Sequence, residues 1–242
     1  MRRLRFEAYL GPAVDRMASA LVDGMRELGF EVDFDSRAPD SVRRRQLQSG
    51  SADVVWACGL LTIELMHAGT WDAEIVAAPV FAGQSAPVYH SMLIAAPGWD
   101  DDLASARIAV NQLDSWSGFR ALELHIDPTG ERRLQPSVVT GSHQASIDAL
   151  RAGAADVAAI DHVVWSHWSG HHPGSDLVVL GRTRDWPSPP ISVASRVLTD
   201  RLRRALLTAR SGPDAQRVGL VRIEPATAEV YELMRRSVRG SS

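Results

Sequence analysis

The sequence has little cysteine and no lysine. Cys58 is the one thiol, and all 26 basic residues are arginine. A single cysteine excludes an intramolecular disulfide, so cysteine usage leaves the redox compartment open. Otherwise, 45% of the 242 residues are hydrophobic and 23% are charged, which is ordinary globular composition. This length predicts one large domain or two smaller lobes.

Long apolar runs and a strong net charge are also missing. A helix that spans a bilayer needs roughly 18 or more consecutive apolar residues, and no such run occurs. We therefore expect no direct membrane insertion. The formal net charge of −3 gives no overall attraction for nucleic acid or anionic membranes, so a nucleic-acid partner is not expected.

The first residues lack the pattern of an export signal. The start, "MRRLRFEAYLGPAVDRM", is basic, but Glu7 and Asp15 interrupt the apolar stretch that a signal peptide requires. The sequence as written therefore predicts a protein without an export signal. If the sequence is complete, this pattern predicts a cytoplasmic protein.

Short apolar runs alternate with amphipathic runs, which predicts an α/β fold. The expected strands are 4–10, 31–36, 52–58, 107–113, 134–140 and 155–161. The expected helices between and after them are 13–28, 41–50, 117–126, 143–153, 199–209 and 225–238. The first strands and helices form one β-α-β-α-β unit, and the later ones form a second similar unit.

The two halves also share local sequence. "RRQLQSGSADVVWACG" and "IDALRAGAADVAAIDH" align so that Gly50 matches Gly153 and Asp53 matches Asp156. Each segment predicts a helix, a tight turn at glycine and a buried strand. The match is compatible with two similar α/β units, and also with chance, because this order is common in α/β proteins.

Two extended, proline-containing segments separate the expected units. Proline fits poorly inside helices and central strands, so residues 88–97 and 185–193 are predicted to be hinge crossovers. Lobe one then comprises residues 1–87 and 194–242, and lobe two comprises residues 98–184. A ligand is expected in the cleft between the lobes, beyond the carboxyl ends of the strands.

The segment "NQLDSWSGF" lies at the carboxyl end of an expected strand. Ser115 or Ser117 can cap the helix that follows, and Gly118 lets a ligand approach the backbone. Unpaired N–H groups and the positive end of the helix dipole favour an anion at this position. The same residues are also typical of ordinary helix capping, so both interpretations remain open.

A second strand, in "VVTGSHQASIDAL", is also followed by a capped helix. Ser142 is the expected cap, and His143 is expected in the first helical turn. The strand ending in "VAAID" delivers Asp161 to the same sheet edge, as a ligand contact or as the cap of the next helix. Together these segments predict a pocket at this edge.

Lobe one is expected to supply the facing wall of the pocket. Tyr9 ends its first strand, and Thr62 follows the strand 52–58. Tyr89 lies at the start of the first crossover. Aromatic side chains at these positions are also compatible with simple packing.

These segments resemble the phosphonate-type solute-binding proteins of ABC transporters. The resemblance rests on "GSADVVWACG", "PVYHSMLIA", "LASARIAVNQLDSWSGF", "VVTGSHQASIDALRAGAADVAAIDHVVW" and "WPSPPISVAS", and it extends over roughly residues 50–210. It implies a two-lobed, type II periplasmic binding protein (Venus-flytrap) fold with two hinge strands. It further implies capture of a small anionic solute, a phosphonate- or phosphate-like oxyanion, for transport or sensing.

The resemblance also implies roles for individual residues, a partner and a location. By position, Ser115, Trp116, Ser117 and Gly118 match the oxyanion-binding loop of the family. His143 and Asp161 match further polar contacts of the site, and Tyr89 matches an aromatic position before the hinge. An ABC transporter permease is the implied partner, with a periplasmic or extracellular location, no cofactor and no catalysis.

Trp116 departs from the family pattern, in which a small hydroxyl residue is usual. An indole there would fill space or stack on a ring, so a second hypothesis is a cytoplasmic binder or biosynthetic enzyme for a thiamine-precursor-like heterocycle. A serine hydrolase using Ser117, His143 and Asp161 is a third. A fourth is a metal site in "HVVWSHWSGHH", whose histidines are His162, His167, His171 and His172.

Overall fold

The computed structural model describes residues 3–38, 40–103, 105–129, 134–209 and 219–239. The chain divides into two compact units. Unit 1 consists of Met1–Val88 and Pro187–Arg235, and unit 2 consists of Tyr89–Trp186 and Arg236–Ser242. The chain therefore enters unit 2 at Tyr89, returns to unit 1 at Pro187 and ends in unit 2 from Arg236 on.

Unit 1 is built on a six-stranded mixed sheet, with strand order β13-β4-β12-β3-β1-β2. The strands are β1 (Leu4–Tyr9), β2 (Val32–Asp33), β3 (Val54–Ala57), β4 (Ala73–Phe81), β12 (Ile191–Ala194) and β13 (Leu220–Pro225). β1 pairs in parallel with β2 and β3. β12 runs antiparallel to β3 and β4, and β13 runs antiparallel to β4.

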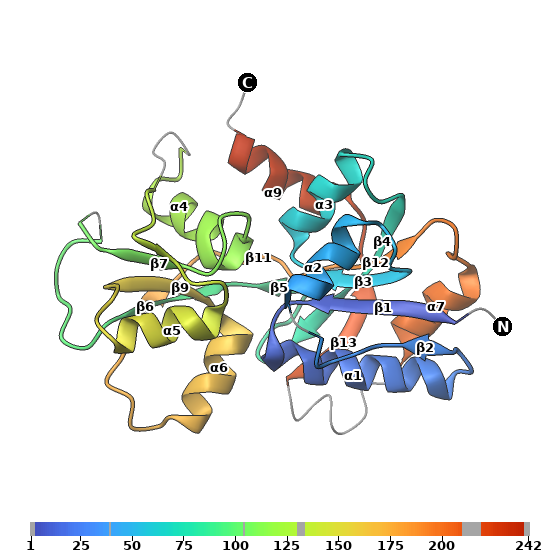
Figure 1. The fold of residues 1–242 in the computed structure, drawn as a ribbon, viewed down its shortest axis with the longest axis horizontal. Coiled ribbons are helices and arrows are strands. Elements are labelled where there is room, and N and C mark those ends of the chain that lie inside the picture. Colours follow the sequence, from blue (N-terminus) through green and yellow to red (C-terminus); the bar gives the residue numbers. More distant parts are fainter. Residues whose placement is uncertain (1–2, 39, 104, 130–133, 210–218, 240–242) are drawn as a thin grey trace. The chain divides into compact units, whose positions relative to one another are not determined.

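Five helices accompany this sheet in the described part of the chain. They are α1 (Pro12–Glu27), α2 (Asp40–Gln48), α3 (Gly59–His67), α7 (Asp200–Thr208) and α9 (Glu229–Arg239). Figure 1 shows α1 and α2 on opposite sides of β1. Leu47 of α2 packs with Val55 and Trp71 in one buried cluster. Helices thus cover both faces of the sheet, which is why its central strands are apolar.

Unit 2 contains a five-stranded sheet, with strand order β10-β6-β9-β7-β8. The strands are β6 (Ser91–Ala95), β7 (Ile108–Val110), β8 (Val138–Val139), β9 (Val157–Asp161) and β10 (Val178–Arg182). β7 pairs in parallel with β8 and β9, whereas β6 runs antiparallel to β9 and β10. A separate two-stranded sheet joins β5 (Val88–Tyr89) to β11 (Trp186–Pro187).

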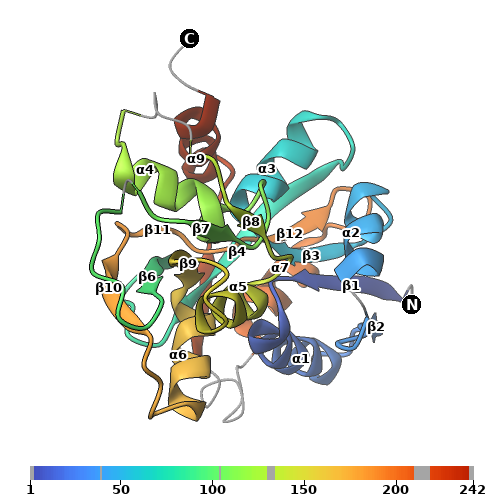
Figure 2. The same cartoon turned by 60° about the vertical axis from the view of Figure 1, so that its left-hand side comes forward.

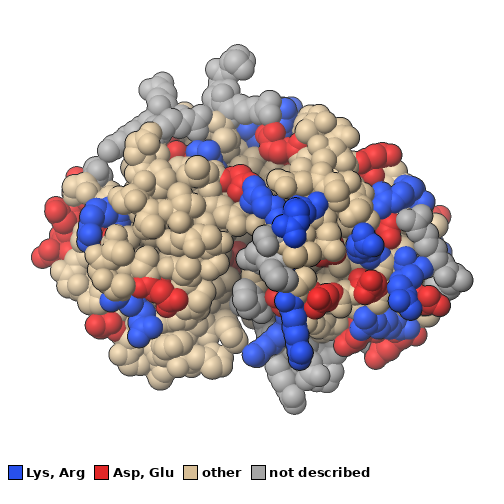
Figure 3. Space-filling view, in the orientation of Figure 1, with Lys and Arg blue, Asp and Glu red and all other residues tan. Residues whose placement is uncertain are grey.

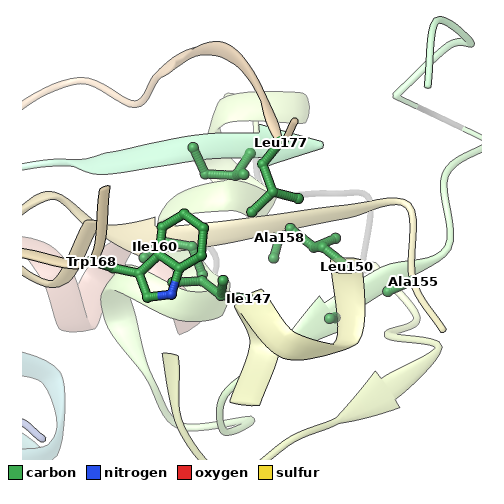
Figure 4. Packing of buried hydrophobic residues seen from close by; sticks show 9 residues of the cluster. Ile147, Leu150, Ala155, Ala158, Ile160, Trp168 and Leu177 are labelled. Carbon is green, nitrogen blue, oxygen red and sulfur yellow. The ribbon is translucent and has the colours of Figure 1, made fainter. Parts of the chain in front are cut away.

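The helices of unit 2 follow its parallel strands. A five-residue π-helix, η1 (Trp116–Arg120), leads into α4 (Ala121–Ile126), and α5 (His143–Arg151) and α6 (His162–His171) come later. Ile147 and Leu150 of α5 pack with Ile160 of β9 and Trp168 of α6 in one core cluster (Figure 4). This packing fixes α5 and α6 against the sheet, and with them the start of each helix.

The structure confirms the expected α/β architecture, and it differs from the expected elements in places. Residues 88–97 include β6, which lies inside the sheet of unit 2, and residues 185–193 include part of β12. The sequence pattern predicted no strands at β4, β10 or β13 and no helix at α3. These elements complete the two sheets and the surface of unit 1.

The local sequence match between the halves corresponds to a shared structure. Gly50 and Gly153 both have a positive φ, of 63° and 68°. Asp53 and Asp156 each accept a hydrogen bond from a backbone N–H near the start of the neighbouring strand, at 3.0 and 2.7 Å. The left-handed turn requires glycine, and the carboxylate fixes the register of the two strands.

The visible surface carries charges of both signs. On the face shown in Figure 3, acidic and basic side chains are interspersed over unit 1, and most of the visible surface of unit 2 is uncharged. Within the residues that the structure describes, no helix has both the length and the apolar character that crossing a membrane demands.

Candidate ligand-binding site

Three strand ends in unit 2 form one edge of its sheet. β8, β7 and β9 are neighbours and run in parallel, so their carboxyl ends lie on the same side. η1 follows β7, α5 follows β8 and α6 follows β9. Figure 2 shows α4 and α5 near β7. The structure therefore brings three helix N-termini, with the polar residues that begin them, to one edge.

Ser115 caps the first of these helices. Its backbone is extended, with φ −76° and ψ 133°, and its Oγ accepts a hydrogen bond from Gly118 N at 3.1 Å. Its carbonyl oxygen accepts from Arg120 N at 3.1 Å, which widens the first turn into a π-helix. Ser115, and not Ser117, is the cap, and the Ser115 hydroxyl proton remains able to bind an acceptor.

Ser117 links two of the helix N-termini. Its Oγ lies 3.0 Å from Nε2 of His143, and both side chains are buried. Its carbonyl oxygen accepts a hydrogen bond from Ser91 Oγ at 2.7 Å. The loop after β7 is thereby bonded to the start of α5 on one side and to β6 on the other.

His143 is the first residue of α5, and its buried position disfavours the charged imidazolium. Ser142 caps the helix by accepting from Ala145 N at 3.1 Å. Burial lowers the pKa of His143, and the nearby Asp161 partly opposes this shift. The positive end of the helix dipole acts in the same direction as burial. A neutral imidazole can exchange one hydrogen bond with Ser117 and does not add a positive charge to the site.

Asp161 ends β9 and caps α6. Its Oδ1 accepts a hydrogen bond from Val163 N at 2.8 Å. Burial raises the pKa of this carboxyl, and His143 and the backbone N–H groups oppose the rise. The sequence left open whether Asp161 is a cap or a ligand contact, and in the structure it is a cap beside His143.

Trp116 does not have the exposed position that ring stacking on a ligand would need. Its indole is fully buried and packs edge-to-face on Trp186, with ring centroids 4.4 Å apart and planes at 78°. This geometry is favourable for two aromatic rings. Of the two alternatives that the sequence left open for Trp116, this packing favours filling space over stacking on a ligand ring. Tyr89 is likewise buried, 6.5 Å from the ring of His162.

Gly118 and Asn111 fit closely together. A Cβ atom placed on Gly118 would lie 1.9 Å from Oδ1 of Asn111, which is too close for any side chain. The Asn111 carbonyl accepts from Gly141 N, and its Oδ1 accepts from Gln112 N, both at 2.8 Å. Asn111 therefore ties together the loops that precede η1 and α5. In the sequence, the only signal for this role of Asn111 is its place at the end of a strand.

The remaining expected site residues, Tyr9 and Thr62, belong to unit 1. Tyr9 ends β1, is partly buried and accepts a hydrogen bond at its hydroxyl from Arg44 Nη1 at 3.4 Å. Thr62 lies in α3, and its buried hydroxyl has no hydrogen-bond partner within the described residues. A ligand-binding role for these two residues remains a prediction.

The four histidines near α6 do not converge on one point. In the described parts of the chain, no three His, Cys, Asp or Glu side chains are placed to hold a metal ion together. His162 is buried at the start of α6, whereas His167 and His171 are exposed, with ring centroids 4.5 Å apart. His172 stacks on Trp168. The geometry does not support the metal-site hypothesis.

Two α/β units with helix N-termini at a sheet edge define the class of type II periplasmic binding proteins. A family model described as "ABC transporter, phosphonate, periplasmic substrate-binding protein" matches residues 12–231. The chain belongs to this family, as the sequence resemblance implied. A search of curated proteins found no match.

Solved structures share the fold over nearly the whole chain. The PhnD1 protein of Prochlorococcus marinus, in complex with methylphosphonate, matches with a TM-score of 0.78 and 16% identity, covering 98% of this chain and 97% of that one. A binding protein component of a phosphonate ABC transporter from Pseudomonas aeruginosa gives 0.75 and 19%, with coverage of 97% and 85%. A Xanthomonas citri protein bound to ATP gives 0.63 and 18%, with complete coverage of both chains.

The family, the Pseudomonas aeruginosa transporter component and PhnD1 are substrate-binding proteins and not enzymes. This agrees with the chemistry of the Ser117 and His143 pair. A general base must accept a proton, and both burial and the helix N-terminus disfavour a charged His143. Asp161 is occupied as a helix cap. The pair is therefore suited to binding, and the hydrolase hypothesis is not supported.

Proposed function

We propose that this protein binds a small oxyanion of the phosphonate or phosphate class and delivers it to the permease of an ABC transporter. The family membership supports capture of a small solute for transport. The methylphosphonate complex of the related PhnD1 fold supports the oxyanion class. Since members of the family are periplasmic, we propose a periplasmic or extracellular location.

The observation that carries the proposal is the Ser117–His143 pair between two helix N-termini. η1 and α5 each begin with a serine cap, and each presents N–H groups at the same sheet edge. Helix N-termini favour anions through these N–H groups and through the dipole. Ser117 and His143 lie between them at 3.0 Å. An oxyanion at this position would meet donors from two helices at once.

The donors of this proposed site are uncharged groups. The hydroxyl of Ser115 and backbone N–H groups can donate to oxygens of the ligand, and the Ser117–His143 pair, whose mutual hydrogen bond uses one of its two donors, supplies one more. Hydrogen bonds to a charged acceptor are about twice as strong as bonds between neutral groups. Asn111 and Ser91 hold the loop that carries these donors in place. A few such bonds therefore give useful affinity for the anion, and no basic side chain of unit 2 has to contact it.

The position of Trp116 does not support the heterocycle hypothesis. It depended on an indole at position 116 that is open to a ligand ring, and Trp116 is fully buried against Trp186. We therefore propose the oxyanion without a second candidate.

The double variant Ser117→Ala with His143→Ala tests the assignment. The double truncation removes the hydrogen bond that the pair donates to the charged ligand, worth about 1.5 to 3 kcal/mol, so we expect about a tenfold to hundredfold loss of affinity for the oxyanion that the wild type binds. Isothermal titration with methylphosphonate, phosphite and phosphate measures it. Circular dichroism melting checks that the variant is folded.

Ser166→Ala is the matched control, because Ser166 is an exposed hydroxyl on α6 of the same unit. It should leave the affinity unchanged. If the folded double variant bound the oxyanion as tightly as the wild type, the site would be wrongly assigned. If the wild type bound none of the three anions, the proposed ligand class would be wrong.

A further inference from the structure

Unit 2 contains a cavity that is not formed by the Ser117–His143 site. Its volume is about 300 Å³, at the small end of the range for small-molecule sites. α4 and Pro128, two residues beyond its end, form one wall, and the chain between β10 and the end of β11 forms the other. The lining residues are Ala121, Leu124, His125, Pro128, Thr183, Arg184 and Trp186.

Arg184 supplies a positive charge at this cavity. Its guanidinium carbon lies 3.9 Å from the centre of the Trp186 ring, a stacked cation–π arrangement. Stacking orients the plane of the guanidinium and leaves its N–H groups at the edge able to donate. The side chain is exposed and forms no ion pair with another residue in the described ranges. A carboxylate or similar group could accept two of its N–H bonds.

The rest of the lining is mainly apolar. Ala121 and Trp186 are buried, Leu124 is partly buried, and Pro128 adds a rigid apolar ring. His125, which is exposed, adds a second group that can donate a hydrogen bond. A flat apolar body against these walls and one anionic group at Arg184 would match both parts of the lining.

We infer that this cavity is a second ligand site, for a small aromatic anion such as an aromatic carboxylate. The inference goes beyond the proposed oxyanion function and does not depend on it, because none of the proposed oxyanion-binding residues lines the cavity. The two sites are connected through aromatic packing. Trp186 lines the cavity, and its ring contacts Trp116, which lies between Ser115 and Ser117 in the chain. An aromatic anion in the cavity would therefore touch the ring that supports the oxyanion loop.

Benzoate is a suitable probe, with acetate and benzamide as partial probes. Acetate carries the anion without the ring, and benzamide carries the ring without the charge. Saturation-transfer NMR on the full chain measures their dissociation constants. We expect benzoate to bind about tenfold more tightly than either partial probe, since each lacks one of the two interactions.

Two variants test the two walls of the cavity separately. Arg184→Gln removes the charge, and Leu124→Trp fills the cavity without changing the charge. We expect each to weaken benzoate binding about tenfold or more. Arg151→Gln is the matched control, because Arg151 is an exposed arginine of unit 2 outside the cavity.

The oxyanion variant separates this inference from the proposed function. Ser117→Ala with His143→Ala should still bind benzoate, whatever its affinity for methylphosphonate. Loss of benzoate binding in that variant, or equal affinity in the Arg184→Gln and Arg151→Gln proteins, would overturn the second site. So would the absence of benzoate binding to the wild type.

Discussion

Gly118→Ala should destabilise unit 2 and abolish tight oxyanion binding. The new Cβ would lie 1.9 Å from Oδ1 and 2.4 Å from Cγ of Asn111, so one of the two residues must move. Asn111 cannot rotate away without losing its hydrogen bond from Gln112 N. Overpacking of this kind costs about 1 to 3 kcal/mol. The loop that holds Ser115 and Ser117 would shift, and the proposed donors would no longer meet one acceptor.

The same clash can be relieved from the other side, which makes the prediction specific. In the double variant Asn111→Ala with Gly118→Ala, the added Cβ has room, so part of the lost stability should return. Gly170→Ala in α6 is the matched control, because, apart from its chain neighbours and the backbone of its own helix, no atom of the described residues lies within 4 Å of the added Cβ. That change should be neutral or stabilising by up to about 1 kcal/mol, as in other helices.

Urea unfolding of the four proteins measures the free energies, and calorimetric titration measures the affinity for methylphosphonate. If Gly118→Ala were as stable as Gly170→Ala, the close contact with Asn111 would not exist in solution. If stability fell and affinity did not, the loop would be required for folding and not for binding.

The sequence predicted the positions of the helix N-termini better than the side chains that connect them. Ser115, Ser142 and Asp161 each precede a helix, and capping requires a side-chain oxygen at that place in the chain. The contact between Ser117 and His143 depends instead on which strands are neighbours. Strand order is set by packing of the whole sheet and leaves no local signal. The contacts that Ser91 and Asn111 make were not predicted for the same reason.

The strands that were missed share another physical cause. β4 reads "AEIVAAPVF", a nearly continuous apolar run that contains Pro79. It is buried on both faces between β12 and β13, so it shows no alternation of polar and apolar residues. Trp116 shows the same limit at a single residue. An indole beside two serines is compatible with a pocket or a core, and its contact with Trp186, 70 positions away, decides for the core.

Glu7→Gln should change how the stability of unit 1 depends on pH. Glu7 lies within β1 and is only 6% exposed. Burial raises the pKa of this carboxyl from 4.5 to about 7, and the positive charge of Arg43 partly opposes the rise. Arg43 is itself buried and paired with Asp15 at 2.6 Å, so it is only partly available to Glu7. With its nitrogen turned toward Glu7, the amide of Gln46 donates to Oε1 at 2.9 Å.

The sign of the effect follows from the raised pKa. The native protein binds the Glu7 proton more tightly than the unfolded chain, so the stabilising effect is complete below pH 4.5. It is lost as the pH rises to about 7, and it stays lost above that value. At 1.36 kcal/mol per pKa unit, the rise from 4.5 to about 7 corresponds to a loss of about 3 kcal/mol. Glutamine has nearly the same shape and no charge, so Glu7→Gln should be more stable than the wild type at pH 8 and similar to it at pH 4.

Amide hydrogen exchange in peptides covering β1 and β3 reports unit 1 separately from unit 2. At each pH the wild type is compared with Glu7→Gln, so the intrinsic pH dependence of exchange cancels. Glu31→Gln, which removes an exposed carboxylate from the same unit, should retain the wild-type pH dependence. A constant difference between wild type and Glu7→Gln from pH 4 to pH 8 would mean that Glu7 does not bind its proton more tightly in the folded protein. A difference that grows between pH 4.5 and 7 and then levels off would identify Glu7 as a buried carboxyl that titrates near neutral pH.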